Sequence, residues 1–238
     1  MNQGQLLLFP VPLSGGLISS LSVDSVQAMQ QTTFYVVENA KTARHWIKAI
    51  AHPVKLQDIQ VLQIDRNKPT GHWPEIRQIL HSGRSVGLMS EAGLPTVADP
   101  GYELVSAAHK DGIVVKPFAG PNSMMMALMS SGLPAQQFCF DAYLPSKKDA
   151  LRPAVIRLVQ EIKKNAVTRI FMETAYRNNQ LFETLLAHVP DSFLLCIAAG
   201  ISSGQEFIFT KTIKEWKEMT DHRWIELPAI YVLQQAQH

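Results

Sequence analysis

The sequence contains little cysteine, little charge and no strong excess of either charge sign, and each scarcity excludes a class of protein. Two cysteines among 238 residues, Cys139 and Cys196, are too few for a disulfide framework, and both lie in apolar runs typical of free thiols. Charged residues make up 18% and hydrophobic residues 46%, which excludes an intrinsically disordered chain. The 22 lysines and arginines barely exceed the 20 aspartates and glutamates, so composition alone does not demand a polyanionic partner.

Long apolar runs are missing as well. No uncharged stretch approaches the roughly 20 residues that a membrane-spanning helix needs. The N-terminus also lacks the basic start and the long apolar segment of a secretory signal peptide. We therefore expect a cytoplasmic protein without a membrane segment.

Several motifs with well-defined chemistry are absent from the sequence. There is no Gly-x-Gly-x-x-Gly fingerprint, no phosphate-binding lysine motif and no nucleophile elbow. The eight histidines show no metal-ligand spacing, so we expect no metal site. A covalent mechanism has no support in these patterns.

Short apolar runs alternate with amphipathic stretches along the whole chain, which is typical of an α/β protein. In the first half the pattern predicts strands at 6–11, 33–37, 61–64, 85–89 and 113–118, and helices at 23–31, 40–49, 73–81, 102–110 and 122–131. In the second half it predicts strands at 169–172, 193–198, 206–210 and 230–233, and helices at 151–164, 178–188 and 213–219.

The segment 141–149 is the best candidate for a domain boundary. It contains Pro145, Ser146 and the pair Lys147-Lys148, and an amphipathic helix follows it. We expect two α/β domains, residues 1–141 and residues 142–238.

The segment 90–101 is the strongest candidate for a functional loop because it follows a buried strand and is rich in glycine and proline. Ligands of open α/β sheets bind beyond the carboxyl ends of the strands. Gly93 permits unusual backbone angles and close approach of a ligand, while Pro95 and Pro100 stiffen the loop. The structural alternative is a turn that only caps the next helix.

Two further strand-to-helix segments have a similar character. Residues 119–123 contain Gly120, and Asn122 or Ser123 is suited to cap the following helix. Residues 10–16 combine two prolines with two glycines and are weak evidence alone. Either segment is equally compatible with a plain connection. The methionines at 124–126 and 129 are predicted to pack in the core.

The order of motifs from residue 87 to residue 145 resembles that of a known family. Ser90-Glu91-Ala92-Gly93-Leu94-Pro95 followed by Asp99-Pro100-Gly101-Tyr102 resembles the loop of the tetrapyrrole methylase superfamily, and within it the ribosomal RNA small subunit methyltransferase I family. The segments 117–123, 131–134 and 143–145 match in the same order. The resemblance is moderate from 170 to 185 and faint elsewhere.

This resemblance implies an S-adenosylmethionine (SAM)-dependent methyltransferase, with two α/β domains, a cofactor cleft between them and a homodimeric assembly. It implies methyl transfer to a ribose hydroxyl of ribosomal RNA. The cofactor contacts that it implies are Glu91, Ala92, Gly93, Leu94, Pro95, Gly120, Pro121, Asn122, Ser123, Phe171, Met172, Ala199, Pro228 and Ala229. Because the sulfonium of SAM is itself an activated leaving group, the protein mainly has to orient two reactants.

The sequence departs from the family at polar positions. The family's charged stretch in the second domain corresponds here to residues 199–203, which carry no charge, and its Lys-Gly-Glu corresponds to Leu227-Pro228-Ala229. These losses keep two alternatives open: a methyltransferase for a small molecule such as a tetrapyrrole, and a SAM-binding protein without catalysis.

A ribose hydroxyl ionises far above neutral pH, so a general base would assist its methylation. Glu38 and Glu173 are the acidic candidates at strand ends, each with the alternative of a solvated charge or helix cap. The exposed cations expected to meet RNA phosphates are Lys147, Lys148, Arg152, Lys163 and Lys164. Their alternative is a solvated helical face.

Overall fold

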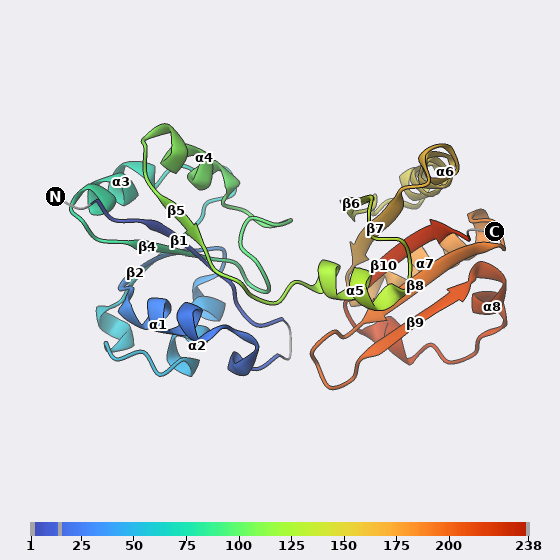
Figure 1. The fold of residues 1–238 in the computed structure, drawn as a ribbon, viewed down its shortest axis with the longest axis horizontal. Helices are drawn as coiled ribbons and strands as arrows, with labels where there is room; N and C mark the ends of the chain where they lie inside the picture. The colour runs from blue at the N-terminus through green and yellow to red at the C-terminus, as the bar shows by residue number, and fades with distance from the viewer. Residues whose placement is uncertain (1–2, 14–15, 237–238) are drawn as a thin grey trace. The chain divides into compact units, whose positions relative to one another are not determined.

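The chain divides into two compact units, each with its own sheet and core (Figure 1). A computed structural model describes residues 3–13 and 16–236, and its contacts separate Met1–Asn122 from Ser123–His238. The sequence placed the boundary at 141/142, which lies inside strand β6 (Phe138–Tyr143) of the second unit. The proline- and lysine-containing stretch that suggested a boundary there is the connection from β6 to helix α6 (Lys148–Asn165).

Strands and helices alternate along the first unit, as the sequence predicted. Its strands are β1 (Leu6–Phe9), β2 (Phe34–Val37), β3 (Gln60–Gln63), β4 (Val86–Met89) and β5 (Val115–Pro117). Its helices are α1 (Val23–Gln31), α2 (Ala40–Ala49), α3 (Trp73–His81) and α4 (Tyr102–Lys110), with short 3₁₀ turns η1 (Ile18–Ser20) and η2 (Leu56–Asp58). The ends of all four predicted helices agree with the structure.

The five described strands of the first unit form a parallel sheet in the order β3-β2-β4-β1-β5. Alternate side chains face opposite sides, so Leu7 and Tyr35 pack with α1 and α2, whereas Leu6 and Val36 pack with α3 and α4. The central strands β1, β2 and β4 are therefore buried on both faces, which explains why they read as continuous apolar runs.

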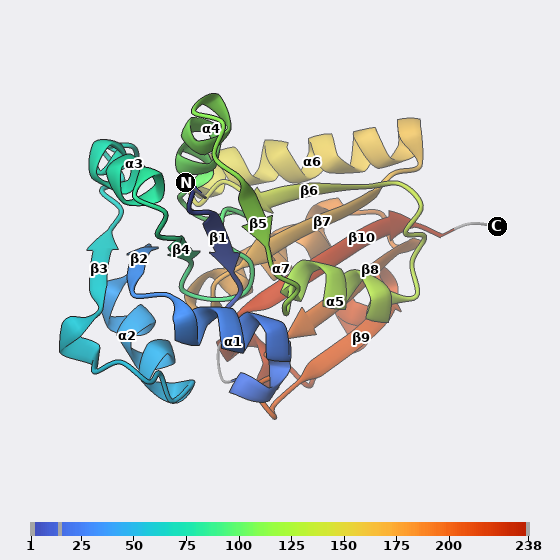
Figure 2. The same cartoon turned by 60° about the vertical axis from the view of Figure 1, so that its left-hand side comes forward.

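The second unit is built on a mixed sheet in the order β6-β7-β10-β8-β9 (Figure 2). Its other strands are β7 (Thr168–Glu173), β8 (Phe193–Ala199), β9 (Phe207–Thr212) and β10 (Ala229–Gln235). Its helices are α5 (Ser123–Ser131), α6, α7 (Asn178–His188) and α8 (Ile213–Glu218), with 3₁₀ turns η3 (Ala175–Arg177) and η4 (Arg223–Glu226). Strand β6 pairs with β7 in parallel, and the remaining pairs are antiparallel.

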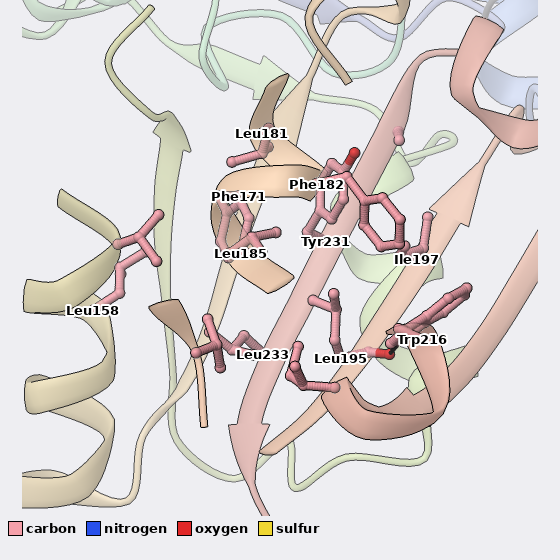
Figure 3. Close-up of a cluster of buried hydrophobic side chains, with 14 of the residues drawn as sticks. Leu158, Phe171, Leu181, Phe182, Leu185, Leu195, Ile197, Trp216, Tyr231 and Leu233 are labelled. Atoms are coloured by element: carbon pink, nitrogen blue, oxygen red, sulfur yellow. Dashed lines mark hydrogen bonds between the residues drawn. The ribbon is translucent and has the colours of Figure 1, made fainter. Parts of the chain in front are cut away.

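One face of the second sheet carries the largest apolar core of the protein (Figure 3). Side chains of α6, α7 and α8, such as Leu158, Leu181 and Trp216, pack there against Phe171 and Tyr231 of the sheet. Helix α5 contacts the strands β7, β8, β9 and β10.

The prediction that the methionines of α5 pack in the core is wrong for Met125 and Met129, which are 41% and 81% exposed. Ala127 and Leu128 supply the buried face of this helix instead. The two cysteines are free, with Cys196 buried and Cys139 partly buried. None of the helices that the structure describes has the length and apolar character required to cross a membrane.

Candidate functional site

After the carboxyl ends of β1 and β4, the chain continues to opposite faces of the first sheet. The helices that follow β1 and β2 cover one face, and the helices that follow β3 and β4 cover the other. Since β4 lies between β2 and β1, the connections diverge on both sides of it. Such divergence opens a crevice at the sheet edge, and this is the usual ligand-binding position of open α/β sheets. The loop 90–101 follows β4 at this point.

The three glycine- and proline-rich loops singled out in the sequence meet in the first unit. Val11 after β1 and Gly93 after β4 exchange two backbone hydrogen bonds, at 2.9 and 3.0 Å. An ideal Cβ on Gly93 would lie 3.5 Å from the carbonyl oxygen of Pro121, in the loop that follows β5. A Cβ on Gly120 would lie 2.1 Å from Cβ of Pro10. Segments far apart in sequence thus form one tightly packed edge, of which Ser14 and Gly15 lie outside the described residues.

The loop after β4 has an unusual backbone as well as a fixed position. Gly93 has φ +72°, and two residues with side chains, Thr96 and Ala98, have φ +70° and +63°. Non-glycine residues in this region cost of order 1–3 kcal/mol each and persist only where surrounding structure enforces them. Strain of this kind is concentrated at binding sites, which favours the functional interpretation of the loop over the helix-capping turn.

An acidic group lies beside this loop, at the end of β2. The side chain of Glu38 is 9% exposed and accepts hydrogen bonds from Arg66 at 3.0 Å and from the backbone N–H of Glu91 at 3.3 Å. Thr42 of α2 donates to the other carboxylate, that of Glu91, at 3.3 Å. Glu38 therefore ties the end of β2 to the start of the loop 90–101.

Asp99, near the end of the same loop, was not singled out as a titratable group in the sequence. Burial, and then the negative charge of Glu38, raise its pKa from 3.8 to about 6, while a hydrogen bond with Ser90 opposes the rise. Only the turn dipeptide after Asp99 was visible in the sequence, because Glu38, the acid with the larger effect on it, comes from a different strand. A carboxyl group with a raised pKa at a sheet edge is typical of functional sites.

In the second unit, Ala199 and Ala229, two of the residues implied by the resemblance, lie in one row across the sheet with Glu173. Ala229 at the start of β10 is paired with Glu173 at the end of β7 and with Ala199 at the end of β8. The N–H of Gly200 donates to the carbonyl oxygen of Pro228 at 3.0 Å. The antiparallel direction of β10 is what brings its first residues next to the last residues of its neighbours.

The side chains of several of these residues point into the core. Phe171 is fully buried and stacks on Tyr231, with ring centroids 5.4 Å apart, and Ala199 and Ala229 belong to the same apolar cluster. Met172 alternates to the opposite face and is partly exposed. A ligand at this row would therefore meet backbone groups rather than most of these side chains.

Glu173, the second acidic candidate, is already engaged by its neighbours. One carboxylate oxygen accepts from the N–H and hydroxyl of Thr174 at 2.8 and 3.2 Å, and the other pairs with Arg177 at 2.7 Å. Arg177 also donates to the carbonyl oxygen of Leu144 at 2.9 Å. With a side chain only 1% exposed, Glu173 joins β7, η3 and the end of β6. The spacing of four residues between the two charges was the available sequence signal.

The remaining predicted cofactor contacts lie where the chain passes from one unit to the other. Gly120, Pro121 and Asn122 end the first unit, and Ser123 begins α5. Among the described residues, no group of three or more histidine, cysteine, aspartate or glutamate side chains is arranged to hold a metal ion.

Comparison with known proteins adds the following. Residues 16–217 match the family model described as tetrapyrrole (corrin/porphyrin) methylases. The ribosomal RNA small subunit methyltransferase I of Escherichia coli O157:H7 is 26% identical over 225 residues, which is 93% of this chain and 75% of that protein. The protein of the same name from Halalkalibacterium halodurans is 30% identical over 185 residues, or 78% of this chain and 60% of that protein. The match thus covers only part of each relative.

Two solved structures share the fold. Diphthine synthase superposes with a TM-score of 0.68 at 14% identity, covering 99% of this chain and 92% of that protein. The uroporphyrin-III-C-methyltransferase of Thermus thermophilus superposes with a TM-score of 0.56 at 17% identity, covering 98% and 94%. At these identities the likeness concerns the fold alone.

Proposed function

Because this chain belongs to the tetrapyrrole (corrin/porphyrin) methylase family, we propose that it is a SAM-dependent methyltransferase that methylates a ribose hydroxyl of ribosomal RNA. The RNA acceptor is supported by the relatives, which are named as methyltransferases of small-subunit ribosomal RNA. The observation that carries the proposal is the convergence of the loops after β1, β4 and β5 at Gly93.

The proposed cofactor contacts form one set in each unit. The first is the loop 91–95 together with residues 120–123, and the second consists of Phe171, Met172, Ala199, Pro228 and Ala229. The residues present fit a nucleoside cofactor because Gly93, at φ +72°, and its two hydrogen bonds with Val11 fix the main chain of the loop beside residues 120–123. When bound, SAM supplies an electrophilic methyl group on a sulfonium leaving group.

The protein's own contribution is to fix the cofactor and to accept a proton. Loops held by backbone hydrogen bonds and proline lose little entropy on binding, so they hold a methyl donor in line with an acceptor at low cost. Of the two acids predicted as bases, Glu38 is favoured over Glu173, because the partner of Glu38, Arg66, is largely exposed whereas Glu173 is held in a buried pair with Arg177. Asp99 lies in the electrostatic field of Glu38, and its pKa of about 6 suits a base that works near neutral pH.

We propose that the RNA binds the solvent-exposed face of helix α6. Lys147 precedes the helix, and Lys148, Arg152, Lys163 and Lys164 are exposed along it. Glu161 is paired with Arg169, which removes an acid from this face. Each phosphate contact on single-stranded RNA contributes a slope of about −0.7 to the dependence of log affinity on log salt. Replacing Arg152 and Lys163 with glutamine should make that slope about 1.4 units shallower.

The decisive experiment is transfer of radiolabelled methyl from SAM to separated RNA and metabolite fractions of bacterial cells. Label in small-subunit ribosomal RNA, and no label in RNA whose ribose 2′-hydroxyls were first converted to methyl ethers, would support the proposal. Label only in small molecules would favour a tetrapyrrole-like acceptor, which the uncharged segment 199–203 also favours. SAM binding without any transfer would favour a protein that has lost catalysis.

We propose a homodimer, in line with the family resemblance, and a cytoplasmic location, which an RNA acceptor in ribosomes would require. Apolar side chains exposed on the second unit support an assembly through it. Met129 of α5 is 81% exposed and Phe209 of β9 is 47% exposed. Light scattering of purified protein should give twice the chain mass, and Met129→Lys should lower it towards that of one chain.

A further inference from the structure

A polar pocket lies in the first unit, at the end of the sheet opposite to the loop 90–101. It is a pocket of about 400 Å³. Three of its lining residues, Gln5, Thr33 and Ser85, directly precede the strands β1, β2 and β4. The pocket therefore faces the amino ends of the strands, whereas the proposed cofactor loops follow their carboxyl ends. No part of the proposed methyl-transfer site contributes to it.

The topology of the unit explains why the pocket exists. In a doubly wound sheet, the helix that follows each strand covers one face. Strand β5 is the last strand of the first unit, and the helix after it, α5, belongs to the second unit. Lys116 of β5 pairs with Leu7 of β1 and so faces the same side as α1, where no further helix of this unit follows. The end of α1, with Ala28 and Gln31, borders the resulting hollow.

Two cations line the pocket, and no acidic residue does. Arg84 precedes β4, and Lys116 lies on β5, so the two flank β1 from opposite sides. Lys116 is level with Gly87 of β4, three residues beyond Arg84, so their backbones are about 10 Å apart across the sheet and about 10 Å apart along it. Both residues are exposed, and neither is ion-paired with a carboxylate in the part of the chain that the structure describes. Such a pair leaves a positive field without a built-in counter-charge.

Two hydroxyl groups line the pocket beside Arg84. The hydroxyl oxygen of Thr33 accepts a hydrogen bond from Arg84 at 3.3 Å, and that of Ser85 accepts from the N–H of Gln5 at 3.1 Å. A hydroxyl that accepts in this way still has its own O–H to donate. Two cations with neighbouring hydroxyl donors are the groups that bind phosphate oxygens.

The floor of the pocket is apolar. Phe118 stacks on Phe9 with ring centroids 5.1 Å apart, and the ammonium of Lys116 lies 5.0 Å from the centre of the Phe118 ring. Leu7 and Ala28 complete this surface. A charged rim over an apolar floor suits a ligand with an anionic group on a flat, weakly polar body, and pockets of roughly 300–1,000 Å³ hold molecules of nucleotide size.

We propose that this pocket is a nucleotide-binding site in which Arg84 and Lys116 bind the phosphate. The ligand is either a free nucleoside monophosphate or one nucleotide of an RNA strand, since both present the same phosphate. The site is separate from methyl transfer and does not depend on the proposed function.

The experiment follows backbone amide signals of the ¹⁵N-labelled protein during titration with cytidine monophosphate, which does not share the adenosine of SAM. Saturable shifts at residues 31–33, 83–85 and 116–118, with residues 90–101 unaffected, are expected. Cytidine should bind at least tenfold more weakly. Adding an RNA octamer identifies the source: displacement of the monophosphate indicates an RNA strand, and coexistence indicates a free nucleotide.

Paired variants with equal charge change separate the pocket from general attraction. Arg84→Gln with Lys116→Gln should weaken cytidine monophosphate at least tenfold, whereas Lys55→Gln with Lys110→Gln, two exposed cations outside the pocket, should change it less than twofold. Both pairs should keep the wild-type thermal unfolding midpoint. Equal weakening in the two pairs, or no saturable shift with the monophosphate, inorganic phosphate or RNA, would overturn the proposal.

Discussion

At the scale of single residues, the carboxyl groups of the first unit show how position determines chemistry. Glu38 keeps a cationic partner, Arg66, while Asp99 is partly buried in the field of Glu38. The two carboxyl groups thus have different surroundings within one loop cluster. This difference makes both residues open to direct test.

Asp99 should make the stability of the protein depend on pH. Its folded pKa of about 6 exceeds the ordinary value of 3.8, so between these values the folded state binds more protons than the unfolded state. Stability should therefore fall as pH rises from about 4 to about 6. Asp99→Asn removes this loss and should gain roughly 1 kcal/mol at pH 7.5, after allowance for solvent screening. Urea unfolding at pH 4.5 and 7.5 measures the gain, and an equal effect at both values would contradict it.

The two candidate bases should respond differently to the loss of charge. Glu38→Gln should lower methyl transfer at least ~100-fold, with little change in stability because its partner Arg66 is largely exposed. Glu173→Gln breaks a buried pair with Arg177 and should destabilise the protein by about 3 kcal/mol. It should leave the rate per folded molecule nearly unchanged. Thermal unfolding and initial rates, measured on both variants, provide the comparison, and a rate loss confined to Glu173→Gln would reverse the assignment.

At the scale of elements, strand β4 combines packing with positioning. Gly87 in its middle faces the rings of Phe9 and Tyr35, and an added Cβ would lie 2.8 Å from each. The close approach of two aromatic rings from β1 and β2 to the strand between them therefore depends on the missing side chain. This packing also fixes the position of β4, and the loop 90–101 follows directly from the end of that strand.

Gly87→Ala should destabilise the first unit by about 1–3 kcal/mol, because an overpacked core must shift its rings or backbone. Gly132→Ala is a useful comparison, since nothing lies within 4 Å of its added Cβ and its cost comes only from a φ of +69°. Chemical unfolding of both variants tests the packing argument. If Gly87→Ala were the less destabilising of the two, the ring contacts would not be limiting.

Elements were predictable from sequence where periodicity and turn residues agreed. Helices α1, α2, α3 and α4 have the predicted ends because glycine, proline or a capping side chain marks them. Strand β6 was not predicted, since its residues Phe138–Tyr143 are only partly buried and show no clean alternation. Its neighbour Pro145 was then interpreted as part of a linker.

The candidate site was predictable only in part. Glycine and proline identified the loops 90–101 and 119–123 because each determines which backbone angles are allowed at its own position. The proximity of Glu38 to Asp99, and the pairing of Glu173 with Arg177, depend on how strands are ordered and where turns point. Local patterns do not contain that information, so Glu38 and Glu173 were equal candidates by sequence although the structure distinguishes them.

At the scale of the whole molecule, the two units have differently built sheets. The first has parallel strands whose connections diverge at β4, and the second has a mixed sheet whose β10 starts beside the ends of β7 and β8. Each unit thus gathers a row of small or proline residues at one sheet edge. The residues of each row are proposed to contact SAM.

The binding of SAM measured by calorimetry tests this claim most directly, using wild-type protein and two glycine variants. Gly93 and Gly112 have nearly equal φ, +72° and +67°, but only the Cβ of Gly93 would enter the loop cluster. We predict one SAM site per chain, weakened at least tenfold by Gly93→Ala and left within twofold by Gly112→Ala. Absence of SAM binding to the wild-type protein, or equal affinity of both variants, would contradict the account.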